Sequence, residues 1–279
     1  PDVTFIDGGA TYATRATGHR LLNMTADATL EGFALVNASG SSATYGWTAV
    51  TASAGTIKGC VISNDFAIGR CPIAALSASA RIEDSTIDGT NTGFQNVNQN
   101  DSNSLITLAD NAVAERCRFV NLKTTGDRSG NSESFSGVVM SGKSVLRNCY
   151  VANNRFGLET DDAVAGKFGG GGVRVTSTAS GCVIDNCTIV NNYSQGKGGG
   201  IDVNVAKVTL RNNLVYGNTA FLKGTGDDAA KLVASDISLN SGSASEPKAV
   251  TPDICRTNAV MLSAPRQVSV GCAARRVSS

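Results

Sequence analysis

Apolar and polar residues alternate in short stretches along this chain of 279 residues, and the stretches recur as copies of one pattern. The two clearest copies occupy 187–192 and 213–218, and the residue that opens each copy is Phe33, Cys60, Ser85, Cys117, Cys149, Cys187 or Asn213. The positions three before and two after this opening residue are apolar in every copy. Because alternation with period two is typical of a strand with one buried face, the pattern predicts short strands that repeat along the chain.

A second alternating stretch ends nine to twelve residues before each opening residue. Successive copies advance by 25 to 38 residues, which fits one turn of a solenoid. The sequence therefore predicts an all-β fold, a right-handed parallel β-helix of about seven to eight coils with a non-repetitive C-terminal cap. The inward-facing residues of the second strand are expected to be the pairs Leu22/Met24, Thr48/Val50, Ala74/Leu76, Ile106/Leu108, Val138/Met140, Val173/Val175 and Ile201/Val203.

Two further columns of the repeat indicate structural roles. The residue two before each opening residue is always charged, along the chain Glu31, Lys58, Glu83, Glu115, Arg147, Asp185 and Arg211. In stacked coils these side chains are expected to point outward and to form ion pairs that stabilise the fold modestly. The residue four after each opening residue is an asparagine or a glycine, which is typical of corners with left-handed backbone geometry and of amide side chains that bond to one another or to the backbone: Asn37, Asn64, Gly89, Asn121, Asn153, Asn191 and Gly217.

The repeat ends before the chain does. An eighth, weakly periodic coil is expected around Leu232, Ile237 and Leu239, and residues 240–279 lose the pattern. Because the open end of a strand stack must be covered, we expect one parallel β-helix over 1–239 and a C-terminal cap over 240–279 that packs on it.

The cysteines fall into separate groups. Cys255 and Cys272 flank a short stretch of the cap and are expected to form a disulfide that closes it. The pairing of Cys71 and Cys182 is left open. Small buried thiols are expected in the inward opening column, where Cys117, Cys149 and Cys187 should remain free.

Composition excludes several classes of protein. With 41% apolar and 17% charged residues, the chain has enough apolar residues to bury a long core as a single unit. A net charge of +1 without a basic run argues against nucleic acid as the partner. No apolar run approaches the roughly 20 residues of a transmembrane helix. A single histidine and the absence of a C-x-x-C pair argue against a zinc site.

Residues 6–9 read Ile-Asp-Gly-Gly and residues 30–33 read Leu-Glu-Gly-Phe. This opening resembles that of secreted bacterial β-helix proteins of the pectin-lyase-like superfamily, in which an I-D-G-G corner precedes an L-x-G-F strand. The Gly-Gly-Gly-Ile at 198–201 is similar to the repeats of polymorphic outer-membrane proteins. The resemblance implies a secreted or cell-surface location, with a signal peptide outside this chain. It implies no single activity, because the superfamily contains lyases, hydrolases, adhesins and tailspikes.

Three long connections, 90–104, 122–136 and 154–171, are expected to leave the stack on the same edge and to flank the outward face of one sheet. Long loops on a rigid scaffold commonly carry function. The outward strip beside them is expected to be small and mostly uncharged, with charge only at its C-terminal end: Asn23, Ala49, Ala75, Thr107, Val139, Arg174 and Asp202.

The charged residues nearest this strip are the candidate ligand-binding site: Asp161, Asp162, Lys167, Arg174, Lys197 and Asp202. The first function hypothesis is a protein that binds a glycan or the surface of another cell-surface protein, as an adhesin does. The second is a polysaccharide lyase acting on a uronic-acid glycan, in which a lysine or arginine serves the reaction. The third is a stalk segment of a larger surface protein. Ca²⁺ held by Asp161 and Asp162 is the one cofactor the sequence suggests.

Overall fold

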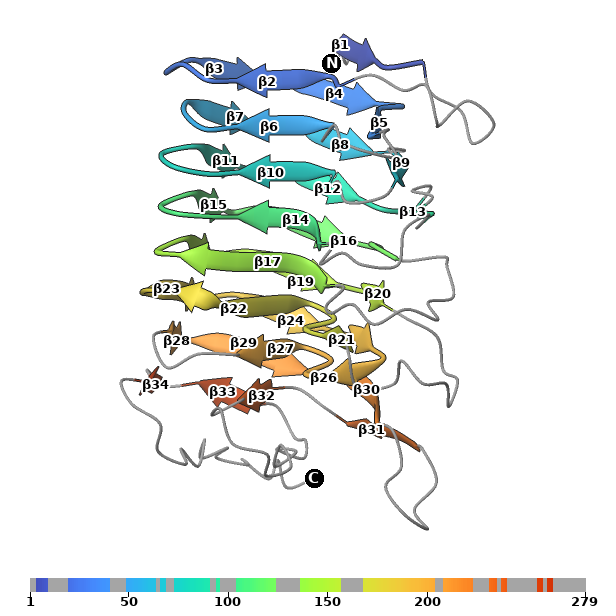
Figure 1. Cartoon of the computed structure of the whole chain (residues 1–279), viewed down its shortest axis with the longest axis vertical. Helices are drawn as coiled ribbons and strands as arrows, with labels where there is room; N and C mark the ends of the chain where they lie inside the picture. Colours follow the sequence, from blue (N-terminus) through green and yellow to red (C-terminus); the bar gives the residue numbers. More distant parts are fainter. Residues whose placement is uncertain are drawn as a thin grey trace, which may run out of the picture.

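The computed structural model describes residues 4–9, 20–40, 49–63, 66–68, 73–90, 94–95, 104–123, 136–156, 168–203, 208–222, 231–234, 237–239, 255–257 and 260–262. All regular structure in these residues is β-strand. The strands wind into a stack of turns that runs along the longest axis of the molecule (Figure 1). Each turn places one strand in each of three long sheets, named here sheets 1, 2 and 3 in the order in which the chain visits them. The predicted parallel β-helix is thereby confirmed as a β-solenoid.

Sheet 1 pairs its strands in parallel throughout: β2 (Leu22–Met24), β6 (Val50–Ala52), β10 (Ala74–Leu76), β14 (Ser104–Leu108), β17 (Ser136–Gly142), β22 (Val173–Ala179), β27 (Ile201–Val203) and β32 (Ile237–Leu239). Sheet 2 is also parallel except at its last strand: β3 (Thr29–Glu31), β7 (Thr56–Lys58), β11 (Arg81–Glu83), β15 (Val113–Glu115), β18 (Val145–Arg147), β23 (Cys182–Asp185), β28 (Val208–Arg211) and β34 (Val260–Leu262).

Sheet 3 begins one strand earlier along the chain and again ends on an antiparallel strand: β1 (Thr4–Asp7), β4 (Phe33–Val36), β8 (Val61–Ser63), β12 (Thr86–Asp88), β16 (Arg118–Val120), β19 (Tyr150–Ala152), β24 (Thr188–Val190), β29 (Asn213–Tyr216) and β33 (Cys255–Thr257). At the C-terminal end β33 and β34 run antiparallel to β29 and β28 and cover the edges of sheets 3 and 2.

Short strands also form where the chain leaves sheet 3, and they lie along one side of the stack (Figure 1). They belong to three small sheets: β5 (Ser39–Gly40), β9 (Phe66–Ile68) and β13 (Phe94–Gln95); β20 (Arg155–Phe156), β25 (Tyr193–Ser194), β30 (Thr219–Leu222) and β31 (Lys231–Ala234); and β21 (Phe168–Gly169) with β26 (Gly196–Lys197).

About five turns, from β6–β8 to β22–β24, have parallel neighbours on both sides in all three long sheets, against the seven to eight coils predicted. The difference lies in the terminal turns. The first, β2–β4, has a parallel neighbour on its outer side only in sheet 3, and the last, β27–β29, is followed by antiparallel strands in sheets 2 and 3. The expected eighth coil is divided, because β32 extends sheet 1 in parallel whereas β31 pairs antiparallel with β30.

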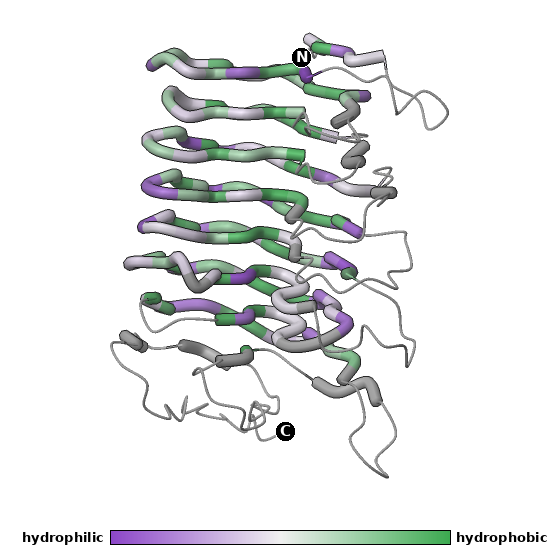
Figure 2. Tube along the Cα trace, in the orientation of Figure 1, coloured by the Kyte–Doolittle hydropathy of each residue, from purple (hydrophilic) through white to green (hydrophobic). Residues whose placement is uncertain are grey.

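The core lies inside the solenoid, and apolar positions recur one above another in successive turns (Figure 2). The predicted core residues Leu146, Ile184, Leu210, Val151 and Ile189 are at most 1% exposed. Burial of this kind stabilises the fold by roughly 25 cal/mol per Å² of apolar surface. The column in sheet 3 is at most 1% exposed in all seven copies of the repeat: Leu35, Ile62, Ile87, Phe119, Val151, Ile189 and Val215.

The second turn departs from the predicted register by two residues. Leu22 and Met24 lie opposite Val50 and Ala52, so the inward pair is Val50/Ala52 and not Thr48/Val50. Ala49, expected on the outward strip, is only 2% exposed, and Thr51 takes the outward place. The cause is a tight turn that is one residue shorter than its neighbours and passes through Gly55 at a φ of 76°.

The corner after sheet 3 has the predicted left-handed geometry at five of the seven positions, with φ between 55° and 67° at Asn37, Asn121, Asn153, Asn191 and Gly217. Gly89 does not adopt this geometry, and Asn64 lies outside the described residues. The amide ladder along the stack, however, is formed one residue further on. Asn154 accepts from the Leu122 amide at 2.9 Å, Asn192 from that of Asn154 at 3.1 Å, and Asn218 from that of Asn192 at 3.0 Å. These three asparagines are at most 1% exposed, so the ladder satisfies backbone groups inside the protein.

From Cys60 onward the opening column is buried, and it carries free thiols, as predicted for Cys117, Cys149 and Cys187. Each of the three donates to a main-chain carbonyl, for example Cys149 to Arg147 at 3.1 Å. The hydrogen bond with Cys149 and burial raise the pKa of Cys117. For Cys149 the bond to Cys117 lowers the pKa, but the neighbouring Cys187 and burial outweigh it and raise the pKa to about 12.

Two further cysteines, Cys60 and Cys182, are also buried and free, which settles the pairing left open for Cys182. Cys71 and Cys272 lie outside the described residues. The Cys255–Cys272 disulfide therefore stays a prediction, and the described part of the chain holds no disulfide.

Candidate functional site

The outward strip of sheet 1 is continuous from the first turn to the last described strand. Its residues lie opposite one another in register in the order Asn23, Thr51, Ala75, Thr107, Val139, Arg174, Asp202 and Ser238. The strip is small and uncharged until β22 and β27, as predicted apart from the replacement of Ala49 by Thr51. Charge enters it only at Arg174 and Asp202, which are direct neighbours on adjacent strands.

Arg174 and Asp202 form an ion pair with 3.7 Å between Nε and Oδ2. Their side chains are 14% and 3% exposed, so the pair is largely removed from water. The separation is longer than that of a hydrogen bond. Nε and Nη1 of Arg174 are buried and have no hydrogen-bond acceptor among the described residues. The guanidinium is therefore held by charge on one side while two of its donor atoms are left unused.

Glycine backbone covers the pair. A Cβ on Gly169 would collide with the Asp202 carboxylate, and a Cβ on Gly170 would lie 2.8 Å from that of Arg174. Gly170 also has a φ of 69°, a geometry that favours glycine. The end of β21 can therefore lie directly on the pair because it has no side chains there.

The glycine runs of the sequence have a second role at this corner. A Cβ on Gly171 would meet the Tyr193 carbonyl oxygen at 2.5 Å, and one on Gly172 would meet that of Gly200 at 2.7 Å. The runs therefore let the main chains of adjacent turns approach each other.

The six predicted site residues are described to different extents. Arg174 and Asp202 come together as expected. Lys197 lies in β26, and its main chain pairs with that of Gly169. Gly169 in turn lies against the Asp202 carboxylate, so the backbone of Lys197 is close to the ion pair. Asp161, Asp162 and Lys167 lie outside the described residues, and their role in the site stays a prediction.

The charged column of sheet 2 contrasts with this pair. Glu31 and Lys58 are 2.9 Å apart, and Arg147 and Arg211 both pair with Asp185. The hydrogen bond from Arg211 lowers the pKa of Asp185 and raises the pKa of the guanidinium. The predicted ion pairs between outward charges of neighbouring turns are thereby confirmed for these residues.

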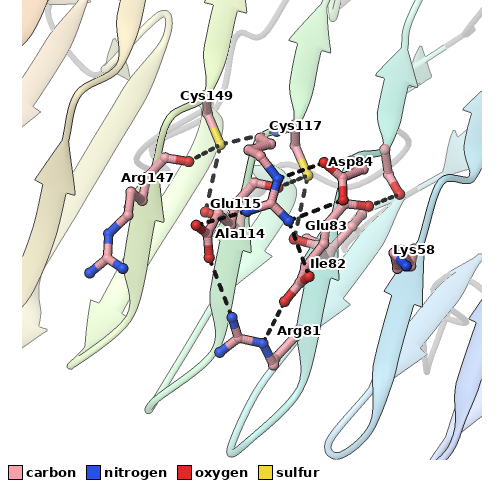
Figure 3. A network of polar contacts seen from close by, with 12 residues as sticks. Lys58, Arg81, Ile82, Glu83, Asp84, Ala114, Glu115, Cys117, Arg147 and Cys149 are labelled. Atoms are coloured by element: carbon pink, nitrogen blue, oxygen red, sulfur yellow. Dashed lines mark hydrogen bonds and ion pairs between the residues drawn. The ribbon is translucent and has the colours of Figure 1, made fainter.

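Two like charges interrupt the alternation of this column, because Glu83 and Glu115 are direct neighbours. Arg81 lies between them, with its guanidinium 2.7 Å from Glu83 and 3.4 Å from Glu115 (Figure 3). Arg116 contacts both carboxylates as well, at 3.3 and 2.9 Å, and binds Asp84 at 2.6 Å. The bond to Arg116 lowers the pKa of Asp84.

The glycine runs at 170–172 and 198–200 were expected from the sequence to let the backbone approach this site, but the bridging arginines and the contact of Gly169 with Asp202 were missed. Arg116 has a φ of 53° at the corner between sheets 2 and 3, where the equivalent positions are Gly32, Gly59, Asp84, Asn148, Asn186 and Asn212. This corner position was not singled out from the sequence, and the arginine in it gave no local signal of its partners. For the cover, the run Gly169–Gly172 was a usable signal, since four glycines beside a strand permit close approach.

The described ranges contain no group of three or more His, Cys, Asp or Glu side chains placed to hold a metal ion. They also contain no helix that is long and apolar enough to cross a membrane. The Ca²⁺ expectation rests on Asp161 and Asp162, which these ranges do not include.

Comparisons of the chain with protein-family models, with curated proteins and with solved structures found no match.

Proposed function

We propose that this β-solenoid is a secreted or cell-surface protein that binds an acidic glycan on the outer face of sheet 1, around Arg174. The observation that carries the proposal is the guanidinium of Arg174, with two buried donor atoms that have no acceptor. Buried polar groups are nearly always hydrogen-bonded, and an unused donor costs about 1–3 kcal/mol. Because Arg174 destabilises the fold in this way and lies, with Asp202, in a strip that is otherwise neutral, it is a candidate for ligand binding.

The chemistry of the guanidinium favours a carboxylate as its ligand. Arginine presents a planar fork of donors that matches a carboxylate in a two-bond geometry, and it stays charged at any working pH. The carboxylate of Asp202 attracts the guanidinium by charge, but Nε of Arg174 does not donate a hydrogen bond to it. Because the pair is shielded from water, a carboxylate that reaches the guanidinium interacts with it more strongly than it would on an open surface.

The rest of the strip suits a neutral sugar chain. Its small residues leave a flat surface along several turns, and Thr51 and Asn23 present polar groups already aligned by a 2.8 Å hydrogen bond. Short strands line one side of the stack, where the chain leaves sheet 3 (Figure 1). A linear polysaccharide with one carboxylate near Arg174 and its neutral rings along the strip is the ligand that this arrangement supports best.

The test is a glycan array that includes polygalacturonate, alginate and neutral polysaccharides, followed by calorimetry on the ligands found. Arg174→Ala is expected to weaken binding to acidic glycans by tenfold or more and to reduce its dependence on salt, since a charge contact is lost. Arg211→Ala is the matched control, because it removes an arginine paired with an aspartate on sheet 2. Equal binding by the parent and Arg174→Ala, or binding of neutral glycans alone, contradicts the proposal.

A polysaccharide lyase is the second proposal, supported by the same guanidinium. A cation that binds the carboxylate of a uronate also stabilises the negative charge that develops when its neighbouring proton is removed. The base would be the side chain of Lys167 or Lys197, neither of which is among the side chains that the structure describes. Incubation with the same acidic glycans, followed at the ultraviolet absorbance of the unsaturated product, separates a lyase from a binding protein.

A further inference from the structure

The two ends of the solenoid differ in how their edges are covered. At the C-terminal end, sheets 2 and 3 end on antiparallel strands, and sheet 1 is extended by β32. At the N-terminal end, only sheet 3 continues outward, through β1. Among the described strands, none pairs with the outer edge of β2 or β3. These two strands and the tight turn between them, residues 22–31, form what is called here the N-terminal edge.

The core is also less covered at this end. Leu22 and Leu30 are only partly buried, whereas Val50 and Ile57, their partners in the next turn, are fully buried. Phe5, on β1 at the same end of the stack, is 64% exposed and is one of few large apolar side chains that face water in the described residues. An open strand edge with apolar side chains beside it is a template for pairing with another chain.

The charges of sheet 2 place a second, independent requirement on any strand that pairs with the outer edge of β3. In sheet 2 most neighbouring charges of the column are opposite in sign, and the like-charged neighbours Glu83 and Glu115 are bridged by arginines. Glu31 is the outermost member and 58% exposed, and its basic partner among the described residues, Lys58, lies on its inner side. A strand added outside β3 would therefore be favoured if it placed a lysine or arginine opposite Glu31.

We propose that the N-terminal edge is a docking site for a strand–turn–strand segment of a partner polypeptide, added in parallel to β2 and β3. The segment places apolar residues opposite Leu22, Met24 and Leu30 and a basic residue opposite Glu31. Main-chain hydrogen bonds supply affinity, and the alternating side chains supply specificity, as in other cases of strand addition. This site lies at the end of the stack and does not depend on the glycan proposal.

The chain itself provides a probe with the required chemistry. Residues 49–59, Ala-Val-Thr-Ala-Ser-Ala-Gly-Thr-Ile-Lys-Gly, contain one strand of sheet 1, the tight turn, one strand of sheet 2 and Lys58. Within the protein this segment pairs in register with β2 and β3 from the inner side. A synthetic, fluorescent peptide of this sequence, capped at both ends, is titrated with the protein and followed by fluorescence anisotropy.

Charge reversal on both partners is the decisive experiment. The parent is expected to bind the Lys58 peptide about three- to tenfold more tightly than the same peptide with Lys58→Glu. The Glu31→Lys protein is expected to reverse this preference, a gain that loss of folding could not produce. Asp185→Asn, an interior member of the same column, is the matched control and should leave the preference unchanged.

Hydrogen exchange locates the bound peptide. Amides of residues 22–24 and 29–31 should gain protection on binding, while those of β28 at the other end should not. No binding of either peptide at millimolar concentration, an unchanged preference in Glu31→Lys, or protection elsewhere than at the N-terminal edge overturns the proposal.

Discussion

Sheets 1 and 2 share the same turns and the same strand spacing, yet their outer faces use charge in opposite ways. On sheet 2 a charge appears in every turn, the lysine and arginine side chains of the ion pairs are 41–46% exposed, and each bridging arginine contacts two or more carboxylates. On sheet 1 the strip is neutral except for one pair, Arg174 and Asp202, which is largely buried. The charges of sheet 2 recur in every copy of the repeat and pair between neighbouring turns, so they stabilise the stack. The pair Arg174 and Asp202 occurs once on sheet 1, which indicates a local role.

The energetics sharpen this contrast. Exposed ion pairs contribute little each, because water already solvates both partners and salt screens them. A buried pair that loses one partner leaves an uncompensated charge in a poorly solvated place, which costs far more. Stability measurements should therefore separate the two faces, even though both contain arginine–carboxylate pairs.

The largest effect is expected for Asp202→Asn. Loss of the carboxylate leaves the Arg174 guanidinium buried without its counter-charge, and the free energy of unfolding should fall by about 3–5 kcal/mol. Denaturant titration of the two proteins measures this difference. Glu31→Gln, which removes an exposed carboxylate from sheet 2, should cost only a small fraction of that amount. Equal losses in the two variants would show that the faces do not differ.

The next effect concerns the cover of the pair. Gly169→Ala should lower the free energy of unfolding by about 1–3 kcal/mol, because the new methyl group collides with the Asp202 carboxylate. The loss should shrink when the alanine is introduced into Asp202→Gly, since the colliding group is then absent. A double-mutant cycle with these variants measures the coupling. Additive losses would mean that Gly169 and Asp202 act independently.

A smaller effect is expected on sheet 2 from acid. The hydrogen bond from Arg211 lowers the pKa of Asp185, so this contact stabilises the fold above the unfolded-state pKa of about 3.9. The stabilisation should be lost as the pH falls below about 4, through the lower folded pKa, because protonation breaks the pair. Thermal unfolding between neutral pH and pH about 2.5 should therefore show a shallower decline in Arg211→Gln than in the parent. Parallel curves would contradict this assignment.

The smallest effect is expected for Arg116→Ala, which removes an exposed side chain that bridges Glu83 and Glu115. The Tm should fall slightly at low salt, since two neighbouring carboxylates then repel each other more. In about 1 M salt, where charges are screened within roughly 3 Å, the difference from the parent should vanish. A difference that persists in high salt would indicate that packing of the arginine stem, not charge, is responsible.

Much of the fold could be predicted because each structural position occurs in several copies of the repeat, and the copies can be compared. The apolar columns around Ile189 and Val215 and the outward charges around Asp185 all follow from comparison between copies. The second turn could not be placed correctly, since both Thr48/Val50 and Val50/Ala52 alternate acceptably. Only the short turn through Gly55 decides between them.

The candidate site could be predicted only in part. Arg174 and Asp202 occupy one column in neighbouring copies, so their contact follows from the repeat alone. Their burial does not, because it depends on how the connection before β22 folds back over the sheet, and connections differ in length and sequence between turns. The asparagine ladder was misplaced by one residue for a related reason. Asparagines occur at both corner positions, and only the backbone geometry shows that Asn191 faces outward in a left-handed corner while Asn192 is buried.

The asparagine ladder also has a direction, with consequences for biosynthesis. In each step the buried asparagine of the later turn accepts from a main-chain amide of the earlier one, and its Nδ2 donates back to a carbonyl there, as Asn192 does to Val151 at 3.1 Å. The corners at Leu122, Asn154 and Asn192 are thus completed only when the following turn has been synthesised. As the chain leaves the ribosome from its N-terminus, we expect these turns to be stabilised one after another in the order of translation.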